Sequence, residues 1–327
     1  MSLSVLVVTS GWPSDEHPDQ SVFVAHEVEA LRAAGVVVDV IHYRGRADPS
    51  NYLKARRKVR RRLRDRDVDL VHAHFGQTLL VVLPSSVPVV ATFHGSDLIG
   101  VVSASGRYGI RGGLLRRLTR MLARWVDAVV VPSRALQAKL PEHVRSTVIP
   151  GAVDTEVFRP ADKAEARRTL GLPADRKLVL FGGRRSVPVK RFELARAAVD
   201  LLPGEGADLV DVDGVPRGAM ALYMSACDAM VVTSRHESGP LVVKEALACN
   251  LPVVSVDVGD VSEWIGSLPG CAICLDDKPE TIARALRDVL ASDIPFTGAE
   301  VIAPLDPSML VRSTIDVYRT VLAARRD

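Results

Sequence analysis

Apolar runs and amphipathic stretches alternate along almost the whole chain. The apolar runs have the length of buried strands, and the stretches between them repeat apolar residues every three or four positions, as helices do. Strands are predicted at 3–9, 36–42, 69–74, 87–93, 128–131, 147–149, 178–181, 209–212, 229–233, 252–256 and 272–275. Helices are predicted at 22–34, 52–66, 111–125, 133–140, 191–202 and 308–324, with others beginning at 217, 241 and 279. Strands that alternate with helices form parallel sheets covered on both faces, so the predicted fold class is α/β.

The alternation is interrupted once, between residues 150 and 163, where the chain is irregular and carries prolines. A chain of 327 residues is also too long for one ordinary core. We therefore predict two Rossmann-like domains, at 1–155 and 156–307, with a linker in this stretch. The final helix, at about 308–327, follows the second domain.

The composition is that of an ordinary soluble globular protein, with 47% hydrophobic and 25% charged residues. No apolar run approaches the ~20 residues that span a bilayer. The first strand begins almost at residue 1, with no basic segment before it and no small-residue cleavage site after it, which argues against a signal peptide. Four cysteines do not make a disulfide framework in a chain of this length. We expect a cytoplasmic protein.

The net charge of +3 is unevenly distributed. The run from Lys54 to Arg64 holds eight basic residues and no acid, on a predicted helix. Such a run is often a solvated helix face. Its density favours an anionic partner, either a membrane surface on its inner face or an anionic acceptor. Nucleic acid is not expected, because no aromatic side chains are interleaved with the charges.

The segment from Ser234 to Pro240 has the features of a phosphate-binding turn. It follows a predicted strand, and Pro240 stands at the first position of the next helix, where proline is favoured. Ligands of parallel sheets bind beyond the carboxyl ends of strands, and free amides at a helix start suit phosphate. Glu237 in this turn is placed to reach a sugar ring, and Glu245 on the helix to reach a ribose diol.

A second segment follows the strand that ends at Phe181. Gly182 and Gly183 let the backbone approach a ligand closely, and Arg184 and Lys190 supply positive charge. Fixed cations stabilise a diphosphate that gains negative charge as it leaves a sugar. Taken alone, these charges are equally typical of a solvated loop.

A third segment, from His94 to Asp97, lies at the end of a strand in the first half of the chain. Together the three segments resemble glycosyltransferase family 4, the retaining enzymes of the GT-B fold. The resemblance runs in order through nearly the whole chain. Its motifs are His-Gly-Ser-Asp at His94–Asp97, Gly-Arg and a later Lys at Gly183, Arg184 and Lys190, and two Glu separated by seven residues at Glu237 and Glu245.

The resemblance implies a retaining transfer of a sugar from a nucleotide diphosphate sugar to an acceptor hydroxyl. It implies a site in the cleft between two facing domains, with the acceptor on the first, the donor on the second, and the final helix crossing back to the first. Neither a metal nor another cofactor is expected. The implied contacts are the diphosphate for Arg184 and Lys190, the ribose for Glu245, the donor sugar for Glu237, the base for Val215, the transferred sugar for His94, and close backbone approach for Gly182, Gly183, Ser238, Gly239, Pro240 and Leu241.

The chain departs from the family pattern most clearly in its second half. Only residues 203–217 separate the helix that ends at Leu202 from Gly218, where the family usually has an additional helix and strand. This shortening motivates one alternative, a catalytically silent GT-B binding module. A GT-B sugar-nucleotide epimerase is another. The intact motif residues favour the transferase over the silent module.

Three further groups have spacings that suit a metal or redox site. His72 and His74 share one face of a strand, but no third and fourth ligands stand out, so a packed or cleft-lining role is expected. Cys271 and Cys274 are expected to be structural, because no second pair accompanies them. The acidic pair at Asp211 and Asp213 is interpreted as a coincidence at the end of a strand. No metal site is predicted.

Overall fold

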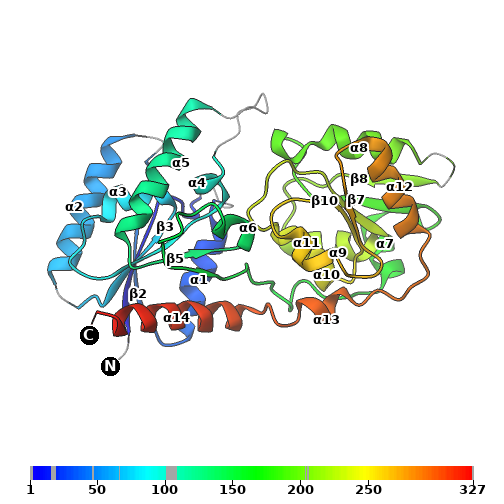
Figure 1. Ribbon diagram of the computed structural model, residues 1–327. Coiled ribbons are helices and arrows are strands. Elements are labelled where there is room, and N and C mark those ends of the chain that lie inside the picture. The colour runs from blue at the N-terminus through cyan, green and yellow to red at the C-terminus, as the bar shows by residue number, and fades with distance from the viewer. Residues whose placement is uncertain are drawn as a thin grey trace. The chain divides into compact units, whose positions relative to one another are not determined.

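The computed structural model describes residues 3–15, 20–45, 48–65, 67–100, 109–202, 204 and 206–325. The chain forms two compact α/β units (Figure 1). Unit 1 contains the chain up to Val101, residues 108–150 and Pro307–Asp327, and unit 2 contains Gly151–Asp306. From the sequence, we predicted this boundary after residue 155 and the start of the last helix at about residue 308.

Unit 1 is built on a six-stranded parallel sheet. The strand order is β2-β1-β3-β4-β5-β6, so the direction of winding reverses between β1 and β3. All residues of β4 and β5 are buried, which explains why these strands read as continuous apolar runs rather than alternating ones. The strands are β1 (Ser4–Thr9), β2 (Val37–His42), β3 (Leu70–His74), β4 (Val89–Thr92), β5 (Ala128–Val131) and β6 (Ser146–Val148).

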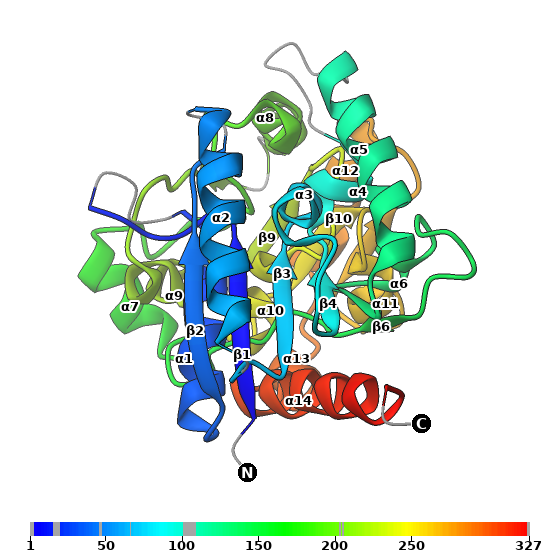
Figure 2. The ribbon, with the colours of Figure 1, turned by 90° about the vertical axis from the view of Figure 1, so that its left-hand side faces the viewer.

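Two layers of helices cover this sheet (Figures 1 and 2). One layer holds α2 (Ser50–Arg64), α3 (Leu79–Val82), α5 (Ile110–Leu122) and α6 (Arg134–Gln137), with the short η1 (Gly76–Thr78), α4 (Gly95–Leu98) and η2 (Ala123–Trp125). The other holds α1 (Val22–Ala33) and the last helix, α14 (Pro307–Ala323). Helix α14 is therefore part of unit 1, although its sequence follows unit 2.

Unit 2 is built on a five-stranded parallel sheet in the order β11-β10-β9-β7-β8, with its winding reversed between β7 and β9. The strands are β7 (Lys177–Phe181), β8 (Ala207–Val210), β9 (Ala229–Val232), β10 (Val253–Val256) and β11 (Ala272–Cys274). The helices are α7 (Lys163–Leu170), α8 (Phe192–Asp200), α9 (Arg217–Ala226), α10 (Leu241–Ala248), α11 (Val261–Ile265), α12 (Pro279–Leu290) and α13 (Gly298–Ile302), with η3 (Pro188–Lys190). In the described part of the chain between α8 and α9, β8 is the one strand.

Strand β8 forms at Ala207–Val210, two residues before its predicted position at 209–212. It is the edge strand of the sheet, and all four of its residues are only half-buried. The apolar pattern at an edge is weak, because one side of the strand has no neighbour. Helices α7, α11 and α13 were also not predicted.

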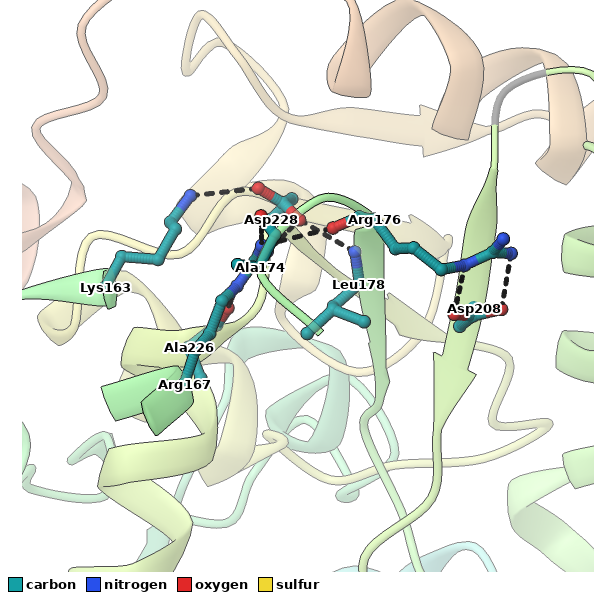
Figure 3. Close-up of polar contacts among 8 residues, drawn as sticks. All are labelled: Lys163, Arg167, Ala174, Arg176, Leu178, Asp208, Ala226 and Asp228. Carbon is teal, nitrogen blue, oxygen red and sulfur yellow. Dashed lines mark hydrogen bonds and ion pairs between the residues drawn. The ribbon is translucent and has the colours of Figure 1, made fainter. Parts of the chain in front are cut away.

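Helix α7 is fixed to unit 2 by charge rather than by a broad apolar face (Figure 3). Its Arg167 is buried, donates to the carbonyl of Ala226 at 2.9 Å, and pairs with Asp228 at 2.7 Å. The same carboxylate accepts from the backbone N–H of Leu178 at 2.7 Å. Because Asp228 precedes β9 and Leu178 lies in β7, one ion pair joins α7 to the amino ends of the two central strands. A pattern of apolar positions does not detect such an anchor.

Candidate active site

Two loops of unit 2 follow the strands between which the winding reverses, one after β7 and one after β9. Gly182 directly follows β7 and donates to the carbonyl of Val231 at 2.9 Å. A Cβ atom on Gly182 would lie 2.8 Å from a methyl of Val232, and one on Gly183 would lie 3.0 Å from side-chain carbons of Lys190. Glycine at both positions therefore allows the first loop to lie tightly against β9 and allows Lys190 to fold back over it.

Lys190 and Glu237 form the centre of this region. The ammonium Nζ of Lys190 lies 2.6 Å from Oε1 of Glu237, and the side chains are 23% and 16% exposed. The hydroxyl of Thr233 donates to the carbonyl of Lys190 at 2.8 Å, and the N–H of Arg235 donates to the carbonyl of Val189 at 2.9 Å. The two predicted loops are thus joined by their backbones, and a charged pair partly open to solvent stands where they meet.

Arg184 extends toward the loop that follows β8. Its Nε lies 3.7 Å from Oδ1 of Asp213, and both side chains are about half exposed, at 54% and 44%. Val215, in the same loop, is half-buried and follows Gly214, whose φ of +71° suits glycine. The predicted contacts to the diphosphate and to the base therefore come from neighbouring loops of one sheet edge.

Glu245 lies in the second turn of α10 and is 13% exposed. Its Oε1 is 3.2 Å from Nη2 of Arg217, at the start of α9. Burial raises the pKa of Glu245 to about 7, and Arg217 opposes this shift. Arg217 also lies over the ring of Phe158, with 5.2 Å from Cζ to the ring centre. The sequence did not identify Arg217 or Phe158, because only the packing of unit 2 brings them to Glu245.

The turn from Ser238 to Leu241 leads from the loop into α10, which begins at Leu241 after Pro240. Ser238 and Leu241 are half-buried. A Cβ on Gly239 would lie 3.3 Å from Oδ2 of Asp260, a buried carboxylate in the loop after β10. Close approach of that loop therefore explains the glycine.

Asp260 is held from two sides. Lys244 Nζ lies 2.7 Å from Asp260 Oδ2, with both side chains almost fully buried, and Trp264 Nε1 donates to the same oxygen at 2.8 Å. The sequence did not predict this pair. Asp260 follows the carboxyl end of β10, where ligands of parallel sheets bind.

His94 lies in unit 1, between β4 and α4. Its backbone N–H donates to the carboxylate of Asp97 at 2.8 Å, which fixes the start of the short helix. The imidazole packs against Phe23 and Phe75, with ring centres 4.8 and 4.6 Å away, and stacks on His74 at 5.8 Å. Burial lowers the pKa of His94 to about 4, so the ring is neutral at physiological pH. Its Nε2 is buried and has no hydrogen-bond partner among the described residues.

His72 and His74 are buried in β3, and the ring of His74 stacks on that of His94. Nδ1 of His72 lies 2.6 Å from the hydroxyl of Tyr318, and Nε2 lies 2.7 Å from the hydroxyl of Thr92. Glu27 of α1 adds a carboxylate 3.9 Å from Nδ1 of His72, and its pKa is raised to about 7 by burial. Glu27, His72 and His74 offer ligand atoms within 4.8 Å of one another. Both nitrogens of His72 already have hydrogen-bond partners, however, which favours the predicted packed role.

The other candidate metal or redox groups lie elsewhere. Cys271 and Cys274 are free thiols, and burial raises the pKa of each to about 11, so neither is a reactive thiolate. Asp211 and Asp213 are exposed in the loop after β8.

The fold of the chain is that of GT-B glycosyltransferases. Sucrose-phosphate synthase from Thermosynechococcus elongatus has a similar structure, with a TM-score of 0.79 at 20% identity, over 98% of this chain and 100% of that chain. Anabaena Alr3699/HepE, solved in complex with UDP-glucose, is similar with a TM-score of 0.72 at 16% identity, over 97% of this chain and 100% of that chain.

Sequence comparison agrees with the fold. A glycosyltransferase attributed to teichuronic acid biosynthesis, TuaC of Bacillus subtilis (strain 168), is 27% identical over an alignment of 356 positions that includes gaps, and the alignment covers 88% of this chain and 88% of that protein. Residues 3–157 match the family described as Glycosyltransferase Family 4, and residues 210–296 match Glycosyl transferases group 1. The protein is an enzyme of the glycosyltransferase class, and it belongs to glycosyltransferase family 4.

Proposed function

We propose that this enzyme transfers a sugar from a nucleotide diphosphate sugar to an acceptor hydroxyl, with retention of configuration at the anomeric carbon. The observation that carries the proposal is the pair of Lys190 and Glu237, 2.6 Å apart where the loops after β7 and β9 meet. Open parallel sheets bind ligands at such a reversal of winding. The similar HepE structure contains UDP-glucose, which supports a nucleotide sugar as the donor.

Lys190 and Arg184 bind the diphosphate of the donor. When the bond from the anomeric carbon to the leaving phosphate oxygen breaks, negative charge grows on the diphosphate, and cations already in place stabilise that charge. Glu237 holds Lys190 in the free enzyme and orients a hydroxyl of the donor sugar in the complex. Gly182 and Gly183 leave room for this approach.

The nucleoside binds along the next part of the same sheet edge. Glu245 accepts hydrogen bonds from the ribose hydroxyls, and Arg217 favours the ionised form of its carboxylate, against the effect of burial. The backbone near Val215 contacts the base, and the turn of Ser238, Gly239, Pro240 and Leu241 surrounds the sugar phosphate.

The acceptor binds on unit 1. His94 is neutral at physiological pH, so it contacts the transferred sugar through a hydrogen bond rather than through a charge. The acceptor hydroxyl attacks on the face of the sugar from which the diphosphate departs, which is why configuration is retained. Neither a metal nor another cofactor takes part, because Arg184 and Lys190 supply the positive charge that the leaving group requires.

The test is to incubate the enzyme with a panel of nucleotide diphosphate sugars and candidate acceptors and to follow the anomeric proton by NMR. A product with the configuration of the donor supports the proposal. Inverted product contradicts retention, and interconversion of donors without transfer indicates an epimerase. Binding of donor or polysaccharide with neither transfer nor hydrolysis indicates a silent binding module.

We also propose a cytoplasmic location at the inner face of the membrane, with contact through the basic run Lys54–Arg64 of α2. Among the described residues, Arg62 of this run is bound to Asp39 and Asp67, while Arg57, Lys58, Arg60, Arg61 and Arg64 form no ion pair. No helix in the described part of the chain is long and apolar enough to cross a membrane. Electrostatic attraction is worth ~1 kcal/mol per basic residue near an anionic surface.

A further inference from the structure

Helix α5 and the following η2 turn carry three large apolar residues on their solvent-exposed side. Leu114, Met121 and Trp125 are 68%, 52% and 72% exposed. On the side of the segment that faces the core, Thr119 and Ala123 are buried, and Leu122 is half-buried against the core. Burial of apolar surface drives folding, so the fold of unit 1 gives no reason for this distribution.

The inner side of α5 is tightly packed at Thr119. A Cβ atom on Gly76 of η1 would lie 2.2 Å from the hydroxyl of Thr119, so the helix already lies very close to η1. The outer side has no such constraint. The three exposed apolar residues stand seven and then four positions apart, which places them on one stripe of the helix.

Arginines flank this stripe, and acids are missing. Between residues 109 and 126 the sequence contains no Asp or Glu. Arg116, Arg117, Arg120 and Arg124 are exposed and form no ion pair within the described chain. An apolar stripe beside unpaired arginines is typical of helices that lie in the interface of an anionic bilayer.

Helix α5 lies in the same layer as α2, with α3 between them (Figure 2). This layer also exposes Leu53 of α2 and Leu80 of α3, at 54% and 41%. It therefore presents five of the ten large apolar side chains that are exposed in the described chain. Exposed apolar residues grouped with basic ones mark an interaction surface more often than scattered ones do.

We propose that α2, α3 and α5 with η2 form one docking surface for an anionic lipid bilayer. The arginines of α5 and the basic run of α2 bind lipid headgroups, and Leu114, Met121 and Trp125 enter the acyl boundary. Charge complementarity and the apolar stripe together select a bilayer as the occupant. The proposal rests on the proposed membrane contact of α2 and adds to it an inserted element, which the basic run alone lacks.

The experiment measures co-sedimentation with vesicles of phosphatidylcholine and anionic phosphatidylglycerol at low and high salt. Salt screens the contribution of the basic residues but not that of inserted side chains. The full chain is expected to bind at low salt and to retain part of its binding at high salt. Leu114→Ser combined with Met121→Ser and Trp125→Ser should abolish the high-salt binding and weaken low-salt binding on the order of tenfold or more.

Two control variants separate this surface from general effects. Leu275→Ser removes a fully exposed leucine of unit 2, and Arg312→Gln with Arg319→Gln removes two exposed charges from α14, in the opposite layer of unit 1. Neither should change vesicle binding. Trp125 fluorescence should shift to the blue on binding in the full chain, and the shift should be lost in Trp125→Leu while binding persists.

The outcomes distinguish the two proposals. Binding that disappears entirely at high salt and does not change in the α5 variant overturns insertion but leaves the contact of α2. Binding that is unaffected when Arg57, Lys58, Arg60, Arg61 and Arg64 are replaced by glutamine overturns the contact of α2. If no vesicles are bound and the α5 variant instead dissociates an oligomer, the surface is an interface between copies of the chain and the membrane proposal is wrong.

Discussion

The hydroxyl of Tyr318 lies 2.6 Å from Nδ1 of His72, a hydrogen bond across 246 positions of the sequence. Burial raises the pKa of Tyr318 well above its usual value and lowers the pKa of His72 to about 3, so both groups are neutral. The neutral imidazole carries one proton, so it donates in one of its two contacts, to Tyr318 at Nδ1 or to the hydroxyl of Thr92 at Nε2, and accepts in the other. This bond fixes α14 to the central strand of unit 1.

Replacing Tyr318 with Phe should destabilise unit 1 by about 1–3 kcal/mol, because it leaves a buried ring nitrogen of His72 without its hydrogen-bond partner. Urea unfolding followed by circular dichroism measures the change. Thr320→Ala, on an exposed position of the same helix, is the control and should shift stability by less than about 0.5 kcal/mol. Equal midpoints for Tyr318→Phe and the parent chain would show that the hydrogen bond contributes nothing.

Arg167→Ala should destabilise unit 2 strongly. Asp228 would keep its contacts with the N–H of Leu178 and with the exposed Lys163, at 3.0 Å, but would lose its buried partner (Figure 3). Removing one member of a buried ion pair typically costs 3–5 kcal/mol. The neighbouring Arg168 is exposed, so Arg168→Ala is the matched control. A loss no larger than that of the control would mean that α7 is held by its few apolar contacts instead.

Glu245 predicts a pH-dependent affinity for the nucleotide. Its pKa is raised to about 7, so the carboxylate is largely ionised above pH 7 and protonated below it. Because the ionised form is the better acceptor for ribose hydroxyls, affinity for a nucleoside diphosphate should fall as the pH is lowered through about 7. Isothermal titration calorimetry between pH 6 and about pH 8.5 measures this dependence.

Glu245→Gln should remove the pH dependence, and Glu245→Ala should weaken binding by about 1.5–3 kcal/mol at pH 8. Glu280→Ala, an exposed position of α12, is the control. If affinity for the free nucleoside diphosphate is the same in Glu245→Ala as in the parent, Glu245 does not bind the ribose.

Lys190→Ala should lower kcat more than it lowers donor affinity, on the order of a hundredfold in kcat. Its charge matters most while the diphosphate departs, so its effect belongs mainly to the transition state. Lys177→Ala, at the exposed start of β7, is the control. Steady-state kinetics combined with calorimetry of the donor separates the two effects. Losses of equal size in kcat and in affinity would instead indicate ordinary ground-state binding.

The central strands and the two loops after β7 and β9 could be predicted from the sequence for the same reason. Strands buried on both faces are continuous apolar runs, and the residues that directly follow them must lie at one edge of a parallel sheet. Lys190 and Glu237 are 47 positions apart but are 2.6 Å apart in space for that reason.

The residues that were missed are those that only packing brings together. Glu27 reaches His72 because α1 lies on the face of β3 that carries this histidine, and Lys244 reaches Asp260 from helix α10. The spacing of residues along the sequence predicts neither contact. Helix α7 was missed because Arg167, a charged residue, is its principal buried side chain beside Ala166.

Activity is expected to survive a strong chelator. In the proposed mechanism, Lys190 and Arg184 bring two positive charges to the leaving diphosphate, which is the role that a divalent cation would otherwise take. Asp213 lies 3.7 Å from Arg184 and accepts a hydrogen bond from the hydroxyl of Ser186 at 3.4 Å, so the negative charge of its carboxylate is partly compensated. The measurement is kcat with EDTA, and again after removal of the chelator and addition of Mg²⁺, Mn²⁺ or Zn²⁺.

If chelation abolished turnover and a divalent cation restored it, two positions in the structure would compete as the site. Asp213→Asn would then block the rescue if the cation binds in the loop after β8. Glu27→Gln would block it if the cation binds at Glu27, His72 and His74, whose ligand atoms lie within 4.8 Å of one another. Binding at that second position also requires the hydrogen bond between Tyr318 and His72 to open, so Tyr318→Phe should raise the affinity for the cation there and leave it unchanged at Asp213. Whether Tyr318→Phe raises the affinity for the cation therefore decides between the two positions independently of the activity.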